Sequence, residues 1–289
     1  MKGNYIPQIV QRYADHDMIK AHTKLPAMAN DRVALLYAFL KRNPANQQVS
    51  ESAAVVTSLV QLGLDTHDMV EIANVHGDDR NMRSRQLKVL AGDYFSSRFY
   101  NILAQTGQVA AIQSLSRAVC EVNRMKMTML VKMNRMKMTA EGYIQLAVEL
   151  RECLFHTFDD RMLAQDVDTW NALLKQVSII EVLNHETERA KGFHTFEHSW
   201  SYWEIYEQGT PEEQQMLIQK QYDTTIWSQL QSKYHITQQL TKMLHKAKNR
   251  YDEIMKSLSD DLYTELSHQL QGSTTNTPLS SYSGLLQRG

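Results

Sequence analysis

Apolar residues recur at three- and four-residue spacing along most of the chain, which is the pattern of amphipathic helices. Asp31 is the expected N-cap of a first helix. A second helix is expected to begin at Ser50 or Ser52, with an apolar stripe made by Val56, Leu59, Val60, Gly63, Leu64 and His67. The same spacing predicts further helices over 87–102, 109–132, 141–158, 169–189, 211–232 and 237–270.

Residues that break helices are scarce. The 289 residues include 11 glycines and 5 prolines, and the prolines lie outside the periodic segments or at their starts. Thr210-Pro211-Glu212-Glu213 is one such start, with a capping residue, a proline and an acidic first turn. We therefore predict an all-α helical bundle. Its expected divisions are an irregular segment over 1–30 with one short helix at most, a single helical domain over 31–271, and a disordered Ser/Thr/Asn-rich tail over 272–289.

Charge and cysteine content exclude several classes of protein. The 31 basic and 32 acidic residues give a net charge of −1, which does not favour a nucleic-acid partner. Cys120 and Cys153 are the only cysteines, so neither a disulfide framework nor a cysteine-based zinc site is expected. The sequence shows no signal peptide and no transmembrane segment, and we expect a cytoplasmic protein.

A first cluster of candidate functional residues lies at the end of the helix that begins near Ser50. Asp65 and Asp68 are three residues apart and point to one side of a helix, while His67 and Glu71 are four apart and have the spacing of a pair. Acidic groups on one helical face can hold a hard cation, or a diphosphate through Mg²⁺. The plainer interpretation is an ordinary acidic helix end.

A second cluster lies on the next predicted helix and consists of Arg85, Gln86, Gly92, Asp93 and Tyr94. A glycine in the middle of a helix costs about 1 kcal/mol relative to alanine, so Gly92 predicts the close approach of another helix. Asp93 beside it would be costly to bury without a partner. The alternative is plain helix packing with no role in binding or catalysis.

Together, residues 59–68 and 85–96 resemble the trans-isoprenyl diphosphate synthase family, and more narrowly the small subunits called component 1 of heptaprenyl diphosphate synthases. The resemblance implies the all-α isoprenoid (polyprenyl) synthase fold. It also implies a heterodimer with a large catalytic subunit, component 2, which extends farnesyl diphosphate with isopentenyl diphosphate for menaquinone biosynthesis. The small subunit of such a prenyltransferase is expected to be regulatory and to help set the length of the prenyl diphosphate chain.

Departures from the family pattern concern catalysis itself. Catalytic members carry two Asp-Asp-x-x-Asp motifs that hold Mg²⁺ against a diphosphate, but here only Asp68 of the first motif is kept, with Met69 and Ile72 at the other two positions. Adjacent aspartates at 78–79, 159–160 and 260–261 lack the third aspartate. Asp65, His67, Asp68 and Glu71 are therefore interpreted as a vestigial motif. We expect no catalytic residue and no cofactor in this chain, with Mg²⁺ bound by the catalytic partner.

An internal repeat indicates a candidate contact surface. Residues 124–128 recur as 135–139, and on one continuous helix the two copies would share a face. The plainer interpretation is a solvated basic face whose methionines fill gaps. The alternative is contact with a partner, a lipid or the growing chain through Met125, Met127, Met136 and Met138.

The segment after residue 190 offers two further alternatives. His194-Thr-Phe-Glu197-His198 matches a His-x-x-Glu-His pattern, which on a helix would place both histidines on one face as a zinc hydrolase requires. Trp200 and Trp203 follow aromatic residues at helical spacing, which is typical of core packing but also of a partner interface. A purely structural helical adaptor is the remaining alternative to a synthase subunit.

Overall fold

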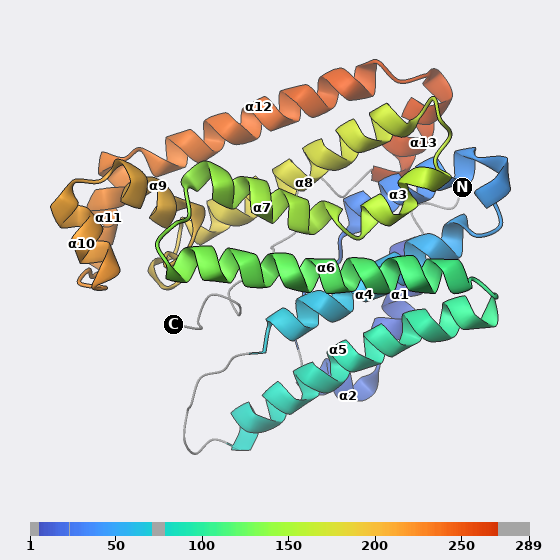
Figure 1. Ribbon diagram of the computed structural model, residues 1–289, viewed down its shortest axis with the longest axis horizontal. Helices are drawn as coiled ribbons and strands as arrows, with labels where there is room; N and C mark the ends of the chain where they lie inside the picture. The colour runs from blue at the N-terminus through green and yellow to red at the C-terminus, as the bar shows by residue number, and fades with distance from the viewer. Residues whose placement is uncertain (1–5, 23, 71–78, 271–289) are drawn as a thin grey trace.

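The computed structural model describes residues 6–22, 24–70 and 79–270, and most of these residues lie in helices. Within these ranges no β-strand occurs, and the all-α prediction is confirmed. The long helices run roughly along the long axis of the molecule (Figure 1). The larger elements are α1 (Ile6–Ala14), α2 (Asp17–His22), α3 (Asn30–Arg42), α4 (Ser50–Asp68), α5 (Asp79–Gln105), α6 (Val109–Asn134), α7 (Ala140–Glu152), α8 (Val167–Arg189), α9 (Trp200–Gln208), α10 (Pro211–Ile218), α11 (Thr224–Lys233), α12 (Ile236–Lys256) and α13 (Asp260–Leu270).

Helices α3 and α4 form the centre of the molecule. Residues 32–40 of α3 and 53–66 of α4 are buried without interruption, as expected of helices that are covered on all sides. Phe39 of α3 packs against Trp170 of α8 with ring centroids 5.6 Å apart. Helix α4 packs most extensively against α5, so the acidic end of α4 is held between several helices.

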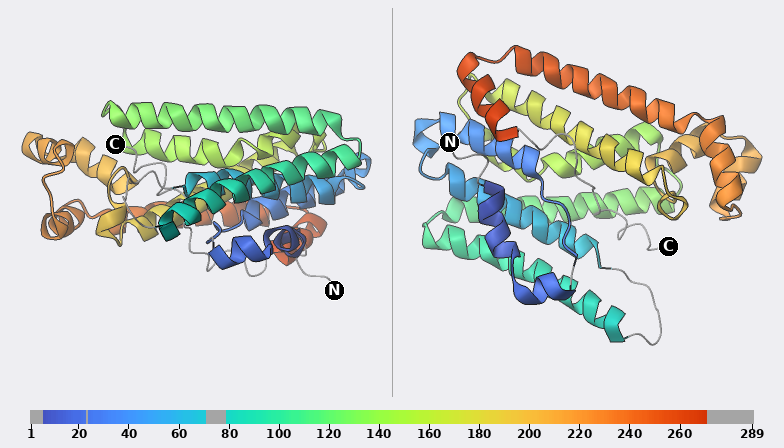
Figure 2. Two further views of the ribbon diagram at one scale, coloured as in Figure 1. Left: turned by 90° about the horizontal axis from the view of Figure 1, so that it is seen from below. Right: turned by 180° about the vertical axis from the view of Figure 1, so that it is seen from behind.

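A second core lies at the end of the bundle formed by α9, α10 and α11 (Figure 2). Phe196, Trp200 and Trp203 are fully or almost fully buried there, together with Ile236 and Leu240 of α12. Trp200 and Trp203 are therefore core residues, as the core-packing interpretation predicts, and the alternative of a partner interface through them is wrong.

Local signals set several helix starts. Thr210 and Glu213 form the reciprocal capping box predicted at the start of α10. Asp223 and Thr139 likewise accept hydrogen bonds from backbone N–H groups in the first turns of α11 and α7. Asp31, by contrast, lies in the first turn of α3 and does not cap it.

Some predicted boundaries are wrong. Among the described residues before α3, two helices occur (α1 and α2) where one short helix at most was expected. The predicted helix over 141–158 ends at Glu152, and a 3₁₀ helix, η2 (Phe155–Arg161), follows it. The predicted helices 211–232 and 237–270 are each two helices. Between α10 and α11, Lys220 adopts φ +54°, a position usually held by glycine, so the sequence gives no stop signal there. The predicted end of the domain at 271 and the tail over 272–289 lie outside the described residues.

No described helix combines the length and the apolar composition that crossing a bilayer requires.

Candidate functional site

The two aspartates of α4 lie in the interior of the bundle. Gln61, one turn before Asp65, donates a hydrogen bond from Nε2 to Asp65 Oδ1 at 2.8 Å. Lys126 of α6 pairs with the other aspartate, with its Nζ 2.5 Å from Asp68 Oδ2. The side chains of Lys126 and Asp68 are 7% and 8% exposed. A buried lysine therefore occupies the position beside the acidic motif, and its ammonium group supplies the positive charge there.

Burial also changes the protonation of Asp65. Loss of solvent raises its pKa from the ordinary 3.8 to about 6, against the opposing attraction of Lys126. The nearby charge of Asp68 raises the pKa further. Asp65 thus holds its proton to a higher pH than an exposed carboxylate does, because burial disfavours its charged form.

A second group of buried charges connects α3, α7 and α8. Arg32 Nε lies 2.8 Å from Glu181 Oε2, and Arg151 Nε lies 3.6 Å from the same oxygen. Arg32 also donates to the backbone oxygen of Arg151 at 2.6 Å and lies 3.5 Å from Gln61 Oε1. In this network Arg32 and Arg151 neutralise the charge of Glu181, and Arg32 connects them to Gln61 of α4.

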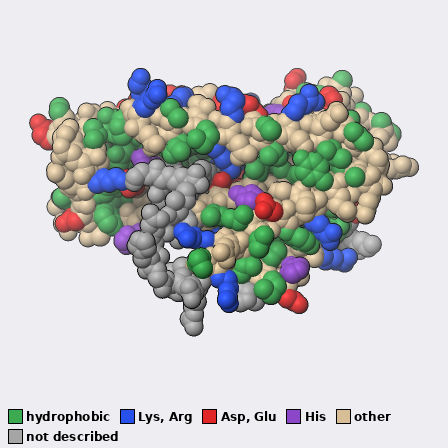
Figure 3. Space-filling view, turned by 60° about the horizontal axis from the view of Figure 1, so that its bottom comes forward, with side chains coloured by type: hydrophobic (Ala, Val, Ile, Leu, Met, Phe, Trp, Pro, Cys, Tyr) green, Lys and Arg blue, Asp and Glu red, His purple; other side chains and the backbone are tan. Residues whose placement is uncertain are grey.

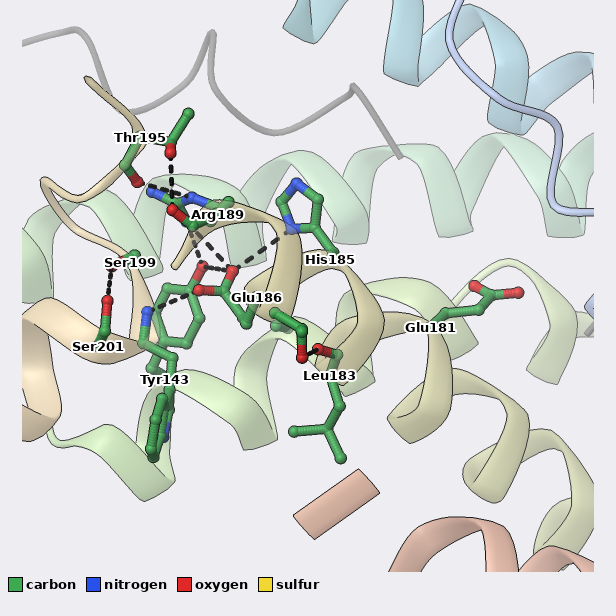
Figure 4. Close-up of polar contacts among 12 residues, drawn as sticks. Tyr143, Glu181, Leu183, His185, Glu186, Arg189, Thr195, Ser199 and Ser201 are labelled. Atoms are coloured by element: carbon green, nitrogen blue, oxygen red, sulfur yellow. Dashed lines mark hydrogen bonds and ion pairs between the residues drawn. The ribbon is translucent and has the colours of Figure 1, made fainter. Parts of the chain in front are cut away.

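A third group centres on Glu186 of α8 (Figure 4). Glu186 accepts hydrogen bonds from the Tyr143 hydroxyl at 2.8 Å and from the Trp200 backbone N–H at 2.7 Å, and it pairs with Arg189 at 3.2 Å. Burial alone would raise the pKa of Glu186, but Arg189 and His185 outweigh it and lower the pKa to about 2. This network joins α7 and α8 to the start of α9, and we assign it a structural role.

A small cavity separates these groups. Its volume is about 30 Å³, and Met129, Met133, Leu150 and Val182 line it beside Lys126. A cavity of this size holds about one or two water molecules and no substrate. The interior of the described chain at this point is therefore filled by its own side chains.

The residues of the predicted second cluster meet α4 at one crossing. A Cβ at Gly92 would lie 2.6 Å from the His67 ring, and a Cβ at Gly63 would lie 3.2 Å from the backbone oxygen of Gly92. The predicted close approach at Gly92 is thus confirmed. His67 Nε2 lies 3.4 Å from the exposed Asp93, whereas Glu71, its predicted partner, lies outside the described residues.

The other residues of that cluster make no contact with Asp65 or Asp68 among the interactions of the described residues. Arg85 is half-buried and Gln86 is exposed. Tyr94 packs edge-on against Phe95 at 5.6 Å. Leu90 is 61% exposed, whereas Ala91, Phe95, Phe99 and Leu103 of α5 are buried.

The methionine repeat does not form one face. Helix α6 ends at Asn134, so the second copy lies in the turn before α7, where Met136 has φ +52°. Met138 is buried, Met125 and Met136 are half-buried against the two cores, and Met127 is 53% exposed. Of the four methionines, Met127 is the one available for contact.

The structure does not place the residues of the predicted zinc site on one helix. Residues 193–195 form a 3₁₀ turn, η3 (Phe193–Thr195), α9 begins only at Trp200, and His198 has φ +56°. His194, Glu197 and His198 therefore do not share a helical face. Across residues 6–22, 24–70 and 79–270, no three His, Cys, Asp or Glu side chains gather as a metal site would require.

Sequence reasoning missed Lys126, Arg32, Glu181 and Glu186. For Lys126 a signal existed, because Val122 precedes it and Met133 follows it at helical spacing on the buried side of α6. Within the basic repeat it was interpreted as solvated. The other three join helices far apart in the sequence, and no local pattern identifies their partners.

Comparisons with known proteins give one family and one fold. The sequence model of the family described as heptaprenyl diphosphate synthase (HEPPP synthase) subunit 1 matches residues 16–231. Heptaprenyl diphosphate synthase component 1 of Geobacillus stearothermophilus is 40% identical over 83 residues, which are 29% of this chain and 36%, about a third, of that protein's length.

Solved structures of prenyl synthases share the arrangement of helices. A decaprenyl diphosphate synthase from Rhodobacter capsulatus matches with a TM-score of 0.68 at 11% identity, over 92% of this chain and 94% of that chain. An octaprenyl pyrophosphate synthase from Helicobacter pylori matches with a TM-score of 0.63 at 15% identity, over 92% and 96%. The fold is thus that of the all-α isoprenoid synthases, as the resemblance implied.

Proposed function

Because the chain belongs to the heptaprenyl diphosphate synthase subunit 1 family, we propose that it is the non-catalytic, regulatory small subunit of a two-subunit long-chain prenyl diphosphate synthase. Its partner is then a large catalytic subunit that binds Mg²⁺ and extends farnesyl diphosphate with isopentenyl diphosphate. The product serves as the menaquinone side chain. The small subunit acts on this reaction by binding, and it helps to set the length of the product.

The buried pair of Lys126 and Asp68 is the observation that carries this proposal. Ionising an allylic diphosphate requires carboxylates that are free to hold Mg²⁺ against the leaving group. Here Lys126 neutralises Asp68, burial raises the pKa of Asp65, and Arg32 and Arg151 flank Glu181. These residues do not fit a diphosphate–Mg²⁺ centre, so we derive no catalytic step for this chain.

An apolar face on α5 and α6 supports a protein partner. Val89 and Tyr100 are exposed on one side of α5, and Val109, Met127 and Val131 are exposed on one side of α6. The Tyr100 hydroxyl lies 3.0 Å from Ser116 Oγ, so the two helices adjoin at this face. Seen from the α5 side, hydrophobic side chains lie among the charged ones across the surface (Figure 3). We call these five residues the α5–α6 face and assign the catalytic partner to it.

Control of product length is then exerted at the surface of this subunit. A cavity of about 30 Å³ beside the acidic motif does not accommodate a prenyl chain of many carbons. The growing chain is therefore expected to lie in the partner or between the two subunits. Of the four methionines that were candidates for contact with the prenyl chain, only Met127 is exposed, and it lies in the α5–α6 face.

An isopentenyl incorporation assay tests the proposal. This chain, the catalytic subunit and their mixture are each given farnesyl diphosphate, labelled isopentenyl diphosphate and Mg²⁺. We expect no incorporation by this chain alone and a long-chain product from the mixture. Activity of this chain alone would refute the non-catalytic role, and an unchanged product with or without it would favour a structural adaptor.

A further inference from the structure

Arg98 of α5 differs from the other basic residues of the described chain. It is half-buried, and among the described arginines and lysines it alone has a buried nitrogen, Nε, that lacks a hydrogen-bond acceptor. Carboxylates neutralise several other basic residues of the interior, namely Arg32, Arg42, Lys126, Arg151 and Arg189. Arg98 makes no ion pair and no hydrogen bond with any described residue. A buried donor without an acceptor is costly, so its surroundings require an explanation.

Two tyrosine rings contact the guanidinium group of Arg98. Its Cζ lies 5.3 Å from the ring centroid of Tyr13 on α1 and 5.4 Å from that of Tyr94 on α5. Tyr94 is one turn before Arg98, so the two side chains share one side of α5. The Tyr94 ring also packs edge-on against Phe95, which is fully buried. The rings attract the cation and fix its position, but they accept none of its N–H groups as a carboxylate would.

His16, which connects α1 to α2, adds a fourth polar side chain at this place. Its ring lies 5.8 Å from that of Tyr94, and α2 packs against α5 here (Figure 2). His16 is exposed, and neither it nor the hydroxyls of Tyr13 and Tyr94 form a hydrogen bond with another described residue. We call Arg98, Tyr13, Tyr94 and His16 the α1–α5 cluster. All four side chains can donate hydrogen bonds to a molecule that arrives from solvent.

The acidic residues next to the cluster in the sequence do not neutralise it. Asp93 lies 3.4 Å from His67 Nε2, and Asp15 accepts a hydrogen bond from a glutamine of α1 at 2.6 Å. Asp17 lies in the first turn of α2, where the helix dipole favours a negative charge. None of these three forms an ion pair with Arg98 in the described chain. The cluster therefore combines a positive charge with several donors and has no carboxylate paired with it.

We propose that the α1–α5 cluster binds a phosphate group. Arg98 supplies the charge and adjacent N–H donors that match two phosphate oxygens. The tyrosine hydroxyls and His16 donate from α5 and from the corner between α1 and α2. A phosphate group offers more acceptor oxygens than a carboxylate, which suits donors that come from two sides. A soluble phosphate compound and a lipid head group share this chemistry. The site is separate from the acidic end of α4, and its binding does not depend on the catalytic partner.

Titration calorimetry of the full chain with inorganic pyrophosphate, without Mg²⁺, tests the proposal. We expect the unmodified chain to bind and Arg98→Met to bind at least about ten-fold more weakly, because methionine fills the space beside the rings but brings no charge and no donor. Tyr13→Phe/Tyr94→Phe keeps both rings, removes only the hydroxyls and should weaken binding a few-fold. Sedimentation with vesicles of phosphatidic acid in phosphatidylcholine, against phosphatidylcholine alone, measures binding to a lipid phosphate.

Arg161→Met is the matched control, because Arg161 is also half-buried beside an aromatic ring, with its Cζ 5.7 Å from the ring centroid of Phe158. This variant should bind as the unmodified chain does. Pyrophosphate binding that Arg98→Met loses would support a soluble phosphate ligand, and vesicle binding alone with the same loss would support a lipid head group.

Two results would overturn the proposal. One is that the unmodified chain binds neither pyrophosphate nor the phosphatidic acid vesicles. The other is that Arg98→Met binds as the unmodified chain does, or loses no more binding than Arg161→Met. Circular dichroism melts show whether the variants fold. If Arg98→Met unfolds early, the double tyrosine variant decides, because both of its rings stay in place, and unchanged binding by it would then overturn the proposal.

Discussion

The pairing of Lys126 with Asp68 decides how the acidic residues are interpreted. Helical spacing correctly predicts that Asp65 and Asp68 lie on one side of α4, because that relation is local. It does not predict the lysine, which lies 58 residues away on another helix. Whether two carboxylates form a metal site or an ion pair depends on such a third group, and only the folded chain shows it.

Removing the lysine should destabilise the fold. Lys126→Met leaves the buried Asp68 without its ammonium partner, and a broken buried pair costs about 3 kcal/mol or more. Lys132→Met, on the exposed side of the same helix, should change the free energy of unfolding by less than about 0.5 kcal/mol. Urea unfolding monitored by circular dichroism measures both. Equal effects of the two changes would show that Lys126 is solvated.

Asp65 should give the stability of the protein a characteristic pH dependence. Its pKa is raised from 3.8 to about 6, so between these values the folded state binds more protons than the unfolded state. The contribution of Asp65 to stability therefore falls as pH rises from about 4 to about 6. Glu186, whose pKa is lowered from 4.5 to about 2, changes stability between these two pH values and overlaps the Asp65 window only between about pH 4 and pH 4.5.

The variant Asp65→Asn isolates this effect. Asparagine keeps the size of the side chain and does not titrate, so the variant should gain stability relative to the unmodified chain between pH 4 and pH 6, by on the order of 2 kcal/mol. Asp93→Asn, an exposed change on α5, is the control. Urea unfolding at both pH values checks the result, and parallel pH profiles for the unmodified chain and Asp65→Asn would exclude a raised pKa.

Most helices were predictable because the spacing of apolar residues is visible within each segment of the sequence. The residues at which the helices end were harder to predict. The capping box at Thr210 and Glu213 is visible in the sequence and confirmed in the structure. The break after α10 and the turn after α6 are not, because Lys220 and Met136 adopt the left-handed conformation without a glycine to indicate it. The second copy of the methionine repeat was misplaced for this reason.

Charged substitutions in the α5–α6 face should weaken binding of the catalytic subunit. Met127→Asp/Val131→Asp places two charges on the exposed side of α6 and should reduce affinity for the catalytic subunit at least about ten-fold. Met18→Asp on α2 is the control, because Met18 and Met127 are both 53% exposed. Titration calorimetry measures the affinities. Met138→Asp is unsuitable because Met138 is buried, and the change would disturb the core.

Unchanged affinity of the Met127→Asp/Val131→Asp variant would show that the partner binds elsewhere. The α5–α6 face would then need another explanation for its exposed apolar side chains. The proposed regulatory role would remain open to test through the incorporation assay, because that assay does not depend on where the two subunits meet.

At the scale of the whole molecule, the scarcity of glycine and proline and the helical periodicity were sufficient for the all-α class. The more specific fold was implied by the family resemblance of residues 59–68 and 85–96, and the close packing predicted at Gly92 is confirmed. The interior beyond these motifs was not predictable. The networks around Glu181 and Glu186 join helices that the sequence gives no reason to place together.

The most direct test of the account measures prenyl transfer by the reconstituted pair with Asp65→Asn in this chain. If the acidic end of α4 does no chemistry, the rate of isopentenyl incorporation and the length of the product should stay within about two-fold of the unmodified pair. An aspartate variant in the metal site of the catalytic subunit is the positive control and should abolish incorporation. A fall of about 100-fold with Asp65→Asn, the effect of removing a catalytic electrostatic group, would contradict the non-catalytic role.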